Sequence, residues 1–117
     1  MPITVDQISA DLTRLTAEIS AETRRMARAR EAKGVLEHPL VVEAFALLEA
    51  RIDKARETSA RGDVATREYV HDLWIHLRDF KGFFEDAVRT GELAEPNIRS
   101  LEQRREFQER RLKLAGR

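Results

Sequence analysis

The stretch YVHDLWIHLRDFKGFFED, residues 69–86, decides the fold because it can be interpreted as a reactive site or as one face of a buried helix. Two histidines, four carboxylates and several aromatic side chains fall within it. At about 100° per residue, however, the apolar side chains collect on one stripe. That stripe consists of Val70, Leu73, Trp74, Leu77, Phe80, Phe84, Ala87 and Val88. The spacing therefore predicts a helix over about 64–90 that buries most of its aromatic residues.

A second row of residues lies beside this stripe. Tyr69, His76 and Phe83 recur every seven residues and form a shoulder on the same helix. The combined apolar face is wider than one neighbouring helix covers. We therefore expect the helix to contact a neighbour within the chain and, through the shoulder, another copy of the chain.

Another helix is predicted just before this one, over about 39–59. Pro39 suits the first helical position, and His38 before it is interpreted as a cap or loop residue. The segment SARGD then predicts a turn, after which Asp63 caps the following helix. Residues 34–94 are thus expected to form an antiparallel helical hairpin.

A heptad pattern marks the N-terminal part of the chain. Thr4 is the expected N-cap, and Gly34 the expected stop, of a helix over about 6–33. The helix that carries this apolar heptad seam is longer than a hairpin formed by the rest of the chain would need to cover its own apolar surface. Residues 1–33 are therefore predicted to be a coiled-coil arm that joins copies of the chain. Its interface positions are Val5, Ile8, Leu12, Leu15, Ile19 and Met26, with Glu22 breaking the apolar row before Ala29.

A fourth helix is predicted to begin near Pro96, after a stop at Gly91. Its apolar residues are sparse among many charges: Ile98, Leu101, Phe107 and Leu112. It is interpreted either as a docked helix with a thin contact or as a semi-ordered arm. The chain as a whole is therefore expected to be all-α and oligomeric, with residues 95–117 as a basic C-terminal helix.

Composition narrows the possible classes of protein. The 117 residues include no cysteine, which excludes disulfides and a cysteine nucleophile. The N-terminal MPITVDQISADL lacks the basic-then-apolar layout of a signal peptide. No apolar run approaches the roughly 20 residues that span a bilayer. We therefore expect a cytoplasmic protein without a membrane partner.

Charge is distributed unevenly although 21 basic and 21 acidic residues balance. Residues 22–33 carry five basic and two acidic side chains, and residues 97–117 carry seven and three. Guanidinium groups bind phosphate oxygens in bidentate fashion, which makes these segments candidate contacts for double-stranded DNA. The candidates are Arg24, Arg25, Arg28, Arg30, Lys33, Arg104, Arg105, Arg110 and Arg111. Alternatively, these side chains are solvated, complement the helix macrodipole or pair with the acidic hairpin.

Glu68, Asp72 and His76 share one flank of the 64–90 helix, with Asp79 close by. Two carboxylates and an imidazole are potential ligands of a divalent metal. The alternative is a solvated face on which Asp72 pairs with His76. No matching ligand set occurs on another segment, and there is neither a nucleophile elbow nor a glycine-rich phosphate loop. We therefore expect no metal, cofactor or small-molecule substrate, and no enzymatic activity.

Four short motifs lie within residues 36–94: LEHPL at 36–40, EAF at 43–45, TRE before Tyr69 and TGELA at 90–94. Together they resemble small helical proteins of tailed phages, prophages and gene transfer agents, some of which are small terminase subunits. The resemblance implies a multimer that binds the DNA to be packaged and presents it to a large terminase motor subunit, without hydrolysing ATP. Many small terminases carry an N-terminal helix-turn-helix, where this chain has its heptad segment. Little sequence preference on DNA is therefore expected.

Three functional hypotheses of different classes follow. The leading hypothesis is a non-enzymatic, oligomeric DNA-packaging component of the small terminase type. The alternative is a structural or adaptor coiled-coil protein that mediates protein–protein assembly without nucleic acid. A third, enzymatic hypothesis depends only on the flank of Glu68, Asp72 and His76.

Overall fold

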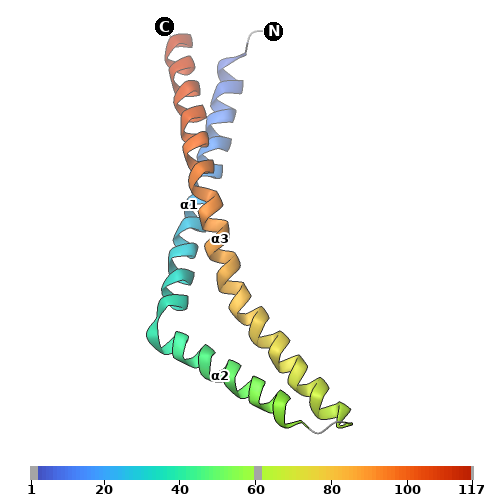
Figure 1. Ribbon diagram of the computed structural model, residues 1–117. Helices are drawn as coiled ribbons and strands as arrows, with labels where there is room; N and C mark the ends of the chain where they lie inside the picture. Colours follow the sequence, from blue (N-terminus) through green and yellow to red (C-terminus); the bar gives the residue numbers. More distant parts are fainter. Residues whose placement is uncertain (1–2, 60–61, 117) are drawn as a thin grey trace. The chain divides into compact units, whose positions relative to one another are not determined.

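The computed structural model describes residues 3–59 and 62–116, and its three helices make it an all-α protein, as predicted. α1 spans Val5–Glu37, α2 spans Pro39–Thr58 and α3 spans Val64–Ala115 (Figure 1). None of these described helices is both long and apolar enough to cross a membrane. Outside the described residues lie the first two positions, part of the predicted SARGD turn and the last basic residue: Met1, Pro2, Ala60, Arg61 and Arg117.

Polar side chains fix where each helix begins. At α1, the Gln7 N–H donates to Thr4 Oγ1 (3.2 Å) and the Thr4 N–H donates to Gln7 Oε1 (2.8 Å), which is a reciprocal capping box. His38 caps α2, its Nδ1 accepting a backbone N–H of the first turn. Asp63 caps α3, its Oδ1 accepting the Thr66 N–H at 3.2 Å. The predicted caps Thr4, His38 and Asp63 are confirmed.

The end of α1 differs from the prediction. Gly34 does not stop the helix, which continues to Glu37. A glycine ends a helix by adopting a positive φ, and within the described part of the chain only Gly62 does so, with φ of 97°. Pro39 supplies the stop instead, because the residue before a proline is driven out of the helical region. His38 accordingly has φ of −64° and ψ of 126°.

The predicted break in α3 is also wrong. Gly91 does not stop the helix and no separate helix begins at Pro96, because one helix of 52 residues includes both. Gly91 is buried, and a Cβ built on it would stand 2.1 Å from the Cβ of Ala29. The glycine therefore permits a close approach of α1 and α3 instead of ending a helix. Pro96 is exposed, and it removes one backbone donor without ending the helix.

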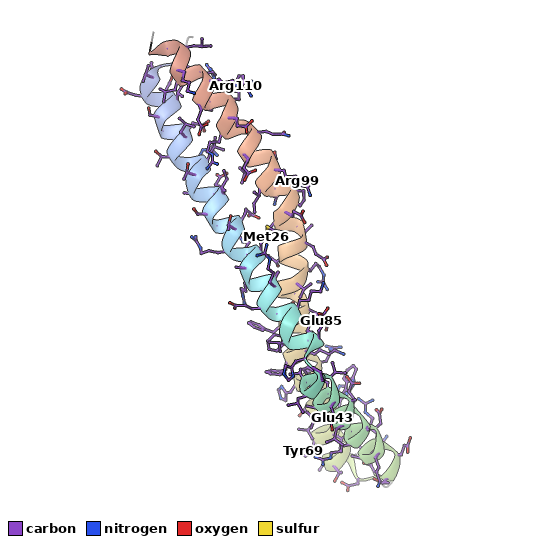
Figure 2. The ribbon with its side chains drawn as sticks, turned by 90° about the vertical axis from the view of Figure 1, so that its left-hand side faces the viewer. Met26, Glu43, Tyr69, Glu85, Arg99 and Arg110 are labelled. Carbon is purple, nitrogen blue, oxygen red and sulfur yellow. The ribbon has the colours of Figure 1, made fainter. Side chains whose placement is uncertain are left out.

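The chain forms two compact units, and the first pairs α1 up to residue 30 with α3 from residue 88. These two segments lie side by side and run antiparallel (Figures 1 and 2). Gln108 Nε2 donates to Asp11 Oδ2 at 2.7 Å towards one end, and Gly91 meets Ala29 towards the other. Leu15 is only 1% exposed, so the heptad seam of α1 is buried at its centre.

The partner of this seam is a second heptad row, on α3, that the sequence-based prediction did not include. Its residues recur in steps of three and four, and each is buried or half-buried: Gly91, Ala94, Ile98, Leu101, Arg105, Gln108 and Leu112. α1 and α3 thus form an antiparallel coiled-coil pair within one chain. Most of the α1 positions predicted to join copies are instead buried or half-buried in the pairing of α1 with α3: Ile8, Leu12, Leu15, Ile19 and Met26. Val5 is exposed.

The second unit, residues 31–87, contains α2 and the first part of α3. Residues 39–58 and 64–87 run antiparallel, and we call them the α2–α3 hairpin. Two contacts fix their register: Lys81 Nζ lies 3.8 Å from Glu49 Oε1, and the Arg56 guanidinium lies 5.1 Å from the centroid of the Trp74 ring. The buried large side chains of this hairpin are Phe45, Ile52 and Val70.

Candidate functional site

One side of the α2–α3 hairpin holds an apolar groove of about 340 Å³. Four residues of α2 and three of α3 line it: Leu48, Arg51, Ile52, Ala55, Val70, Leu73 and Leu77. Ile52 and Val70 are buried, whereas Leu48 and Leu73 remain exposed at its sides. Because all but one of the lining residues are apolar, the groove suits apolar side chains better than a charged ligand.

Aromatic rings continue this apolar surface along α3. The Phe80 ring centroid lies 6.0 Å from that of Phe45 and 5.4 Å from that of Phe84, which in turn lies 5.5 Å from Phe83. Tilted and edge-to-face pairs at such distances hold rings in defined positions. Nevertheless Phe80 is 61% exposed, Phe83 57% and Tyr69 65%. These rings are therefore positioned by packing and still uncovered.

The predicted shoulder belongs to the same surface. Tyr69, Leu73, His76, Phe80 and Phe83 follow one another at alternating spacings of four and three, so each is a neighbour of the next on one stripe of α3. All five are exposed. We call this stripe together with the groove the apolar face of the hairpin. The structure thus brings the shoulder next to a groove that the sequence-based prediction did not foresee.

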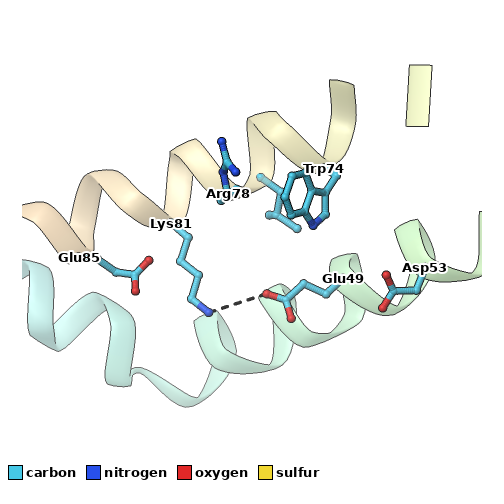
Figure 3. Close-up of a pocket in the computed structure, with 7 residues that line it drawn as sticks. Glu49, Asp53, Trp74, Arg78, Lys81 and Glu85 are labelled. Atoms are coloured by element: carbon cyan, nitrogen blue, oxygen red, sulfur yellow. Dashed lines mark ion pairs between the residues drawn. The ribbon is translucent and has the colours of Figure 1, made fainter. Parts of the chain in front are cut away.

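The other side of the hairpin carries a polar pocket of about 300 Å³ (Figure 3). Its lining combines Glu49, Asp53, Trp74, Leu77, Arg78, Lys81 and Glu85. The Trp74 ring is flanked by two guanidinium groups, with Arg56 at 5.1 Å and Arg78 at 4.9 Å from its centroid. Lys81 pairs with Glu49, and both side chains are half exposed, which makes this ion pair weak. The lining holds three carboxylates and two cations, so its formal charge is −1 and it does not suit an anion.

The flank predicted as a possible metal site is solvated. Glu68, Asp72 and His76 are all exposed. Glu68 and Asp72 border a shallow depression that includes Arg67 and His71 but not His76. Within residues 3–59 and 62–116, no group of three His, Cys, Asp or Glu side chains is arranged to hold a metal ion.

The α1 residues predicted to contact DNA do not form one cluster. Arg24, Arg25 and Arg28 are helix neighbours, whereas Arg30 lies two residues beyond Arg28 and points away from it. Arg25 forms an ion pair with Glu22 on its own helix. Lys33, in the second unit, lies 3.9 Å from Glu37. The basic segment is thus partly neutralised by acidic neighbours on α1.

The α3 arginines behave similarly. Arg105 lies 3.9 Å from Glu109, and Arg110 lies 3.9 Å from Glu106. Arg111 donates to Gln108 at 3.4 Å and stacks on Phe107 with 5.6 Å to the ring centroid. For Arg105 and Arg110, an acidic residue four positions away on the same helix was a readable sequence signal of this pairing.

One groove of the first unit does bring the two basic segments together. Arg25 of α1 and Arg104 of α3 both line it, and its volume is about 390 Å³. Glu18 and Glu22 line the same groove, so its formal charges cancel. A phosphate group would meet as many carboxylates as guanidinium groups there.

Comparisons with protein-family models, with curated proteins and with solved structures find no match to this chain. The candidate site therefore depends on the geometry of the chain itself. Among the features of residues 3–59 and 62–116, the apolar face combines a groove with several uncovered large side chains. Such a surface fits a macromolecular partner better than a reaction centre.

Proposed function

We propose that this chain is a non-enzymatic assembly protein that joins protein subunits through the apolar face of the α2–α3 hairpin. One observation carries the proposal: Tyr69, Phe80 and Phe83 each expose more than half of their surface beside an apolar groove. Contiguous exposed apolar patches mark interaction sites. Because neighbouring rings already hold Phe80 and Phe83 in place, a partner meets a preformed surface, which lowers the entropy cost of binding.

The free energy available from this face is comparable in size with the cost of association. Full burial of a large apolar side chain contributes about 1.5–3 kcal/mol, so five partly exposed ones contribute on the order of 5 kcal/mol per subunit. These side chains are Leu48, Leu73, Tyr69, Phe80 and Phe83. Two subunits double this gain to about 10 kcal/mol, which lies within the range of about 4–15 kcal/mol for the cost of losing free motion.

A second function, phage-type DNA packaging, is supported by the resemblance of residues 36–94 and by particular basic residues. In this function a multimer of the small terminase type binds double-stranded DNA and presents it to a large terminase motor subunit. Arg24 and Arg30 are exposed, and neither has an ion-pair partner among the described residues. Oligomerisation repeats these charges in every copy, so their fields add. Assembly through the hairpin is thus the step on which DNA binding would depend.

The assembly proposal is tested by sedimentation velocity on the full chain over a range of concentrations. We expect the wild-type protein to associate and Phe83→Ser to weaken association. Phe107→Ser is the matched control, because Phe107 is exposed to the same extent, 57%, but lies in the first unit. A wild-type protein that sediments as a single chain at every concentration would overturn the proposal.

DNA binding is tested by fluorescence anisotropy on unrelated duplexes at several salt concentrations. Each neutralised phosphate contributes about 0.9 to the slope of log K against log salt. Replacing Arg24, Arg25 and Arg28 by alanine is expected to weaken binding equally on all duplexes and to flatten that slope. The control is Arg14→Ala with Arg99→Ala, since both are exposed arginines that are not among the predicted DNA contacts. Absence of binding by the wild-type protein at low salt would exclude this function.

A further inference from the structure

Charged side chains border the apolar face differently on its two helices. On α2, Arg51 lines the groove and Lys54 lies three residues further along the same edge. On α3, Asp72 and Asp79 stand four residues before His76 and Phe83 respectively, just outside the exposed stripe. No described residue forms an ion pair with Arg51, Lys54 or Asp72. The α2 edge is therefore basic at Arg51 and Lys54, with Glu43 and Glu57 towards its two ends, and the α3 edge is acidic at Asp72 and Asp79. Both edges lack a full set of partners within the chain.

The antiparallel register sets these two edges at the same height along the hairpin. The register is fixed by two contacts, Glu49 with Lys81 and Arg56 with Trp74. Between them, each step forward on α2 corresponds to one step back on α3. Arg51 therefore lies level with Asp79, and Lys54 lies between the levels of Asp79 and Asp72.

We propose that the partner on the apolar face is a second copy of this chain, related by a two-fold axis parallel to the hairpin helices. This inference rests on the proposed assembly function and adds the identity and orientation of the partner. Rotation about such an axis keeps each residue at its height and places α2 of one copy opposite α3 of the other. Arg51 then faces Asp79 of the partner subunit, and Lys54 lies between Asp79 and Asp72 of the partner subunit, twice in each dimer.

The same charges disfavour the other two-fold arrangement. An axis perpendicular to the helices places α2 opposite α2 and α3 opposite α3. The basic edge would then meet a basic edge and the acidic edge an acidic one, which costs free energy. Charges at the rim of an interface select partner and register more than they add affinity. The edges therefore select the parallel axis, while the apolar side chains drive association.

The apolar face suits this arrangement in shape as well. Two hairpins packed face to face make a four-helix bundle, in which each helix contacts two neighbours. The groove between α2 and α3 accepts side chains from the opposite hairpin, and Leu48 and Leu73 at its sides become core residues. The dimer thereby covers the shoulder of α3, which one neighbouring helix leaves exposed.

Charge reversal tests the orientation. One variant carries Arg51→Glu with Lys54→Glu, a second carries Asp72→Lys with Asp79→Lys, and a third combines all four changes. All four sites are exposed, so the folded hairpin is expected to persist, and circular dichroism checks this. We expect each double variant to raise the dissociation constant of the dimer about tenfold or more, because up to four pairs are reversed at once. The combined variant, with its edges exchanged, is expected to recover wild-type affinity.

Mixing the two double variants gives a second readout. The first has two acidic edges and the second has two basic edges, so each repels itself and attracts the other. Analytical ultracentrifugation of the mixture is expected to show a heterodimer stronger than either homodimer.

The possible failures are distinguishable. Wild-type association that ignores both double variants, or a combined variant that fails to recover, would overturn the orientation and leave the assembly function standing. A wild-type chain that never associates would overturn both.

Discussion

Asp11 links the two helices of the first unit through a single side chain. Its carboxylate accepts from Gln108 across the pair and from Arg14 on its own helix. The hydrogen bond from Arg14 lowers the pKa of Asp11 most, and the one from Gln108 adds to it. Because the folded pKa lies below the ordinary value of 3.8, the stabilisation is complete above pH 3.8 and is lost as the pH falls through the folded pKa.

Gln108→Ala is therefore expected to raise the pKa of Asp11 towards its ordinary value, since one of the two donors disappears. Gln103→Ala is the control, because Gln103 is exposed on the same helix. The measurement is an NMR titration of the Asp11 carboxyl carbon. Equal pKa values in the wild type and in Gln108→Ala would show that the contact with Gln108 does not persist in solution.

Two glycines of α3, Gly91 and Gly82, allow a comparison of the same substitution by alanine at a contacted and at an open position. Gly91→Ala is expected to destabilise the protein by about 1–3 kcal/mol, because its new Cβ overlaps Ala29. Gly82→Ala is expected to stabilise it by about 0.5–1 kcal/mol, since Gly82 is helical and has nothing within 4 Å of a built Cβ. Adding Ala29→Gly to Gly91→Ala should restore stability in urea denaturation. No rescue by Ala29→Gly would mean that the two helices are not in close contact at this point.

At the scale of helices, the sequence predicts the beginnings better than the ends. Thr4, His38 and Asp63 cap through their own side chains, so the signal is local. Gly34 and Gly91 were misinterpreted because a glycine stops a helix only with a positive φ, and that choice depends on packing. Packing of α1 against α3 is a contact between distant segments, which local spacing does not reveal.

The α3 seam was missed for a related reason. Its heptad positions hold Gly91, Arg105 and Gln108 where a typical coiled coil has Leu or Ile, so an apolar pattern does not show them. The candidate site was predictable in part: the seven-residue row of Tyr69, His76 and Phe83 indicated an exposed shoulder. The groove beside it needs the register of α2 against α3, which a single helix pattern does not contain.

Pro96 offers a prediction for α3 as an element. A proline inside a helix removes one hydrogen bond and crowds the preceding turn, at a cost of about 3 kcal/mol. Pro96→Ala is therefore expected to raise the free energy of unfolding by up to about 3 kcal/mol, measured by thermal denaturation. Pro39→Ala is the comparison and is expected to bring no such gain, because Pro39 occupies the first turn of α2, where its missing N–H costs no helical hydrogen bond, and because it also ends α1. A stability loss in Pro96→Ala would contradict a continuous α3.

For the molecule as a whole, assembly makes stability depend on protein concentration. Trp74 is the single tryptophan and lies in the hairpin, so its fluorescence reports on that unit. If copies join, the melting temperature followed by Trp74 rises with concentration, since association stabilises the folded form. Phe83→Ser is expected to remove that rise and Phe107→Ser to keep it. A hundredfold increase in protein concentration is expected to stabilise the folded form by up to about 2.7 kcal/mol through mass action. Wild-type melting curves that superimpose over this concentration range would contradict assembly through this face.

The antiparallel pairing of α1 with α3 also determines the order of events when the chain folds. The bond between Asp11 and Gln108 joins positions 97 residues apart, whereas the register contacts of the hairpin join positions less than half as distant. Closing a long loop costs more entropy and slows folding, so the hairpin is expected to form early and the terminal segments to meet last. On a ribosome, the α1 segment would then wait without its partner until the second half of α3, residues 88–115, has emerged.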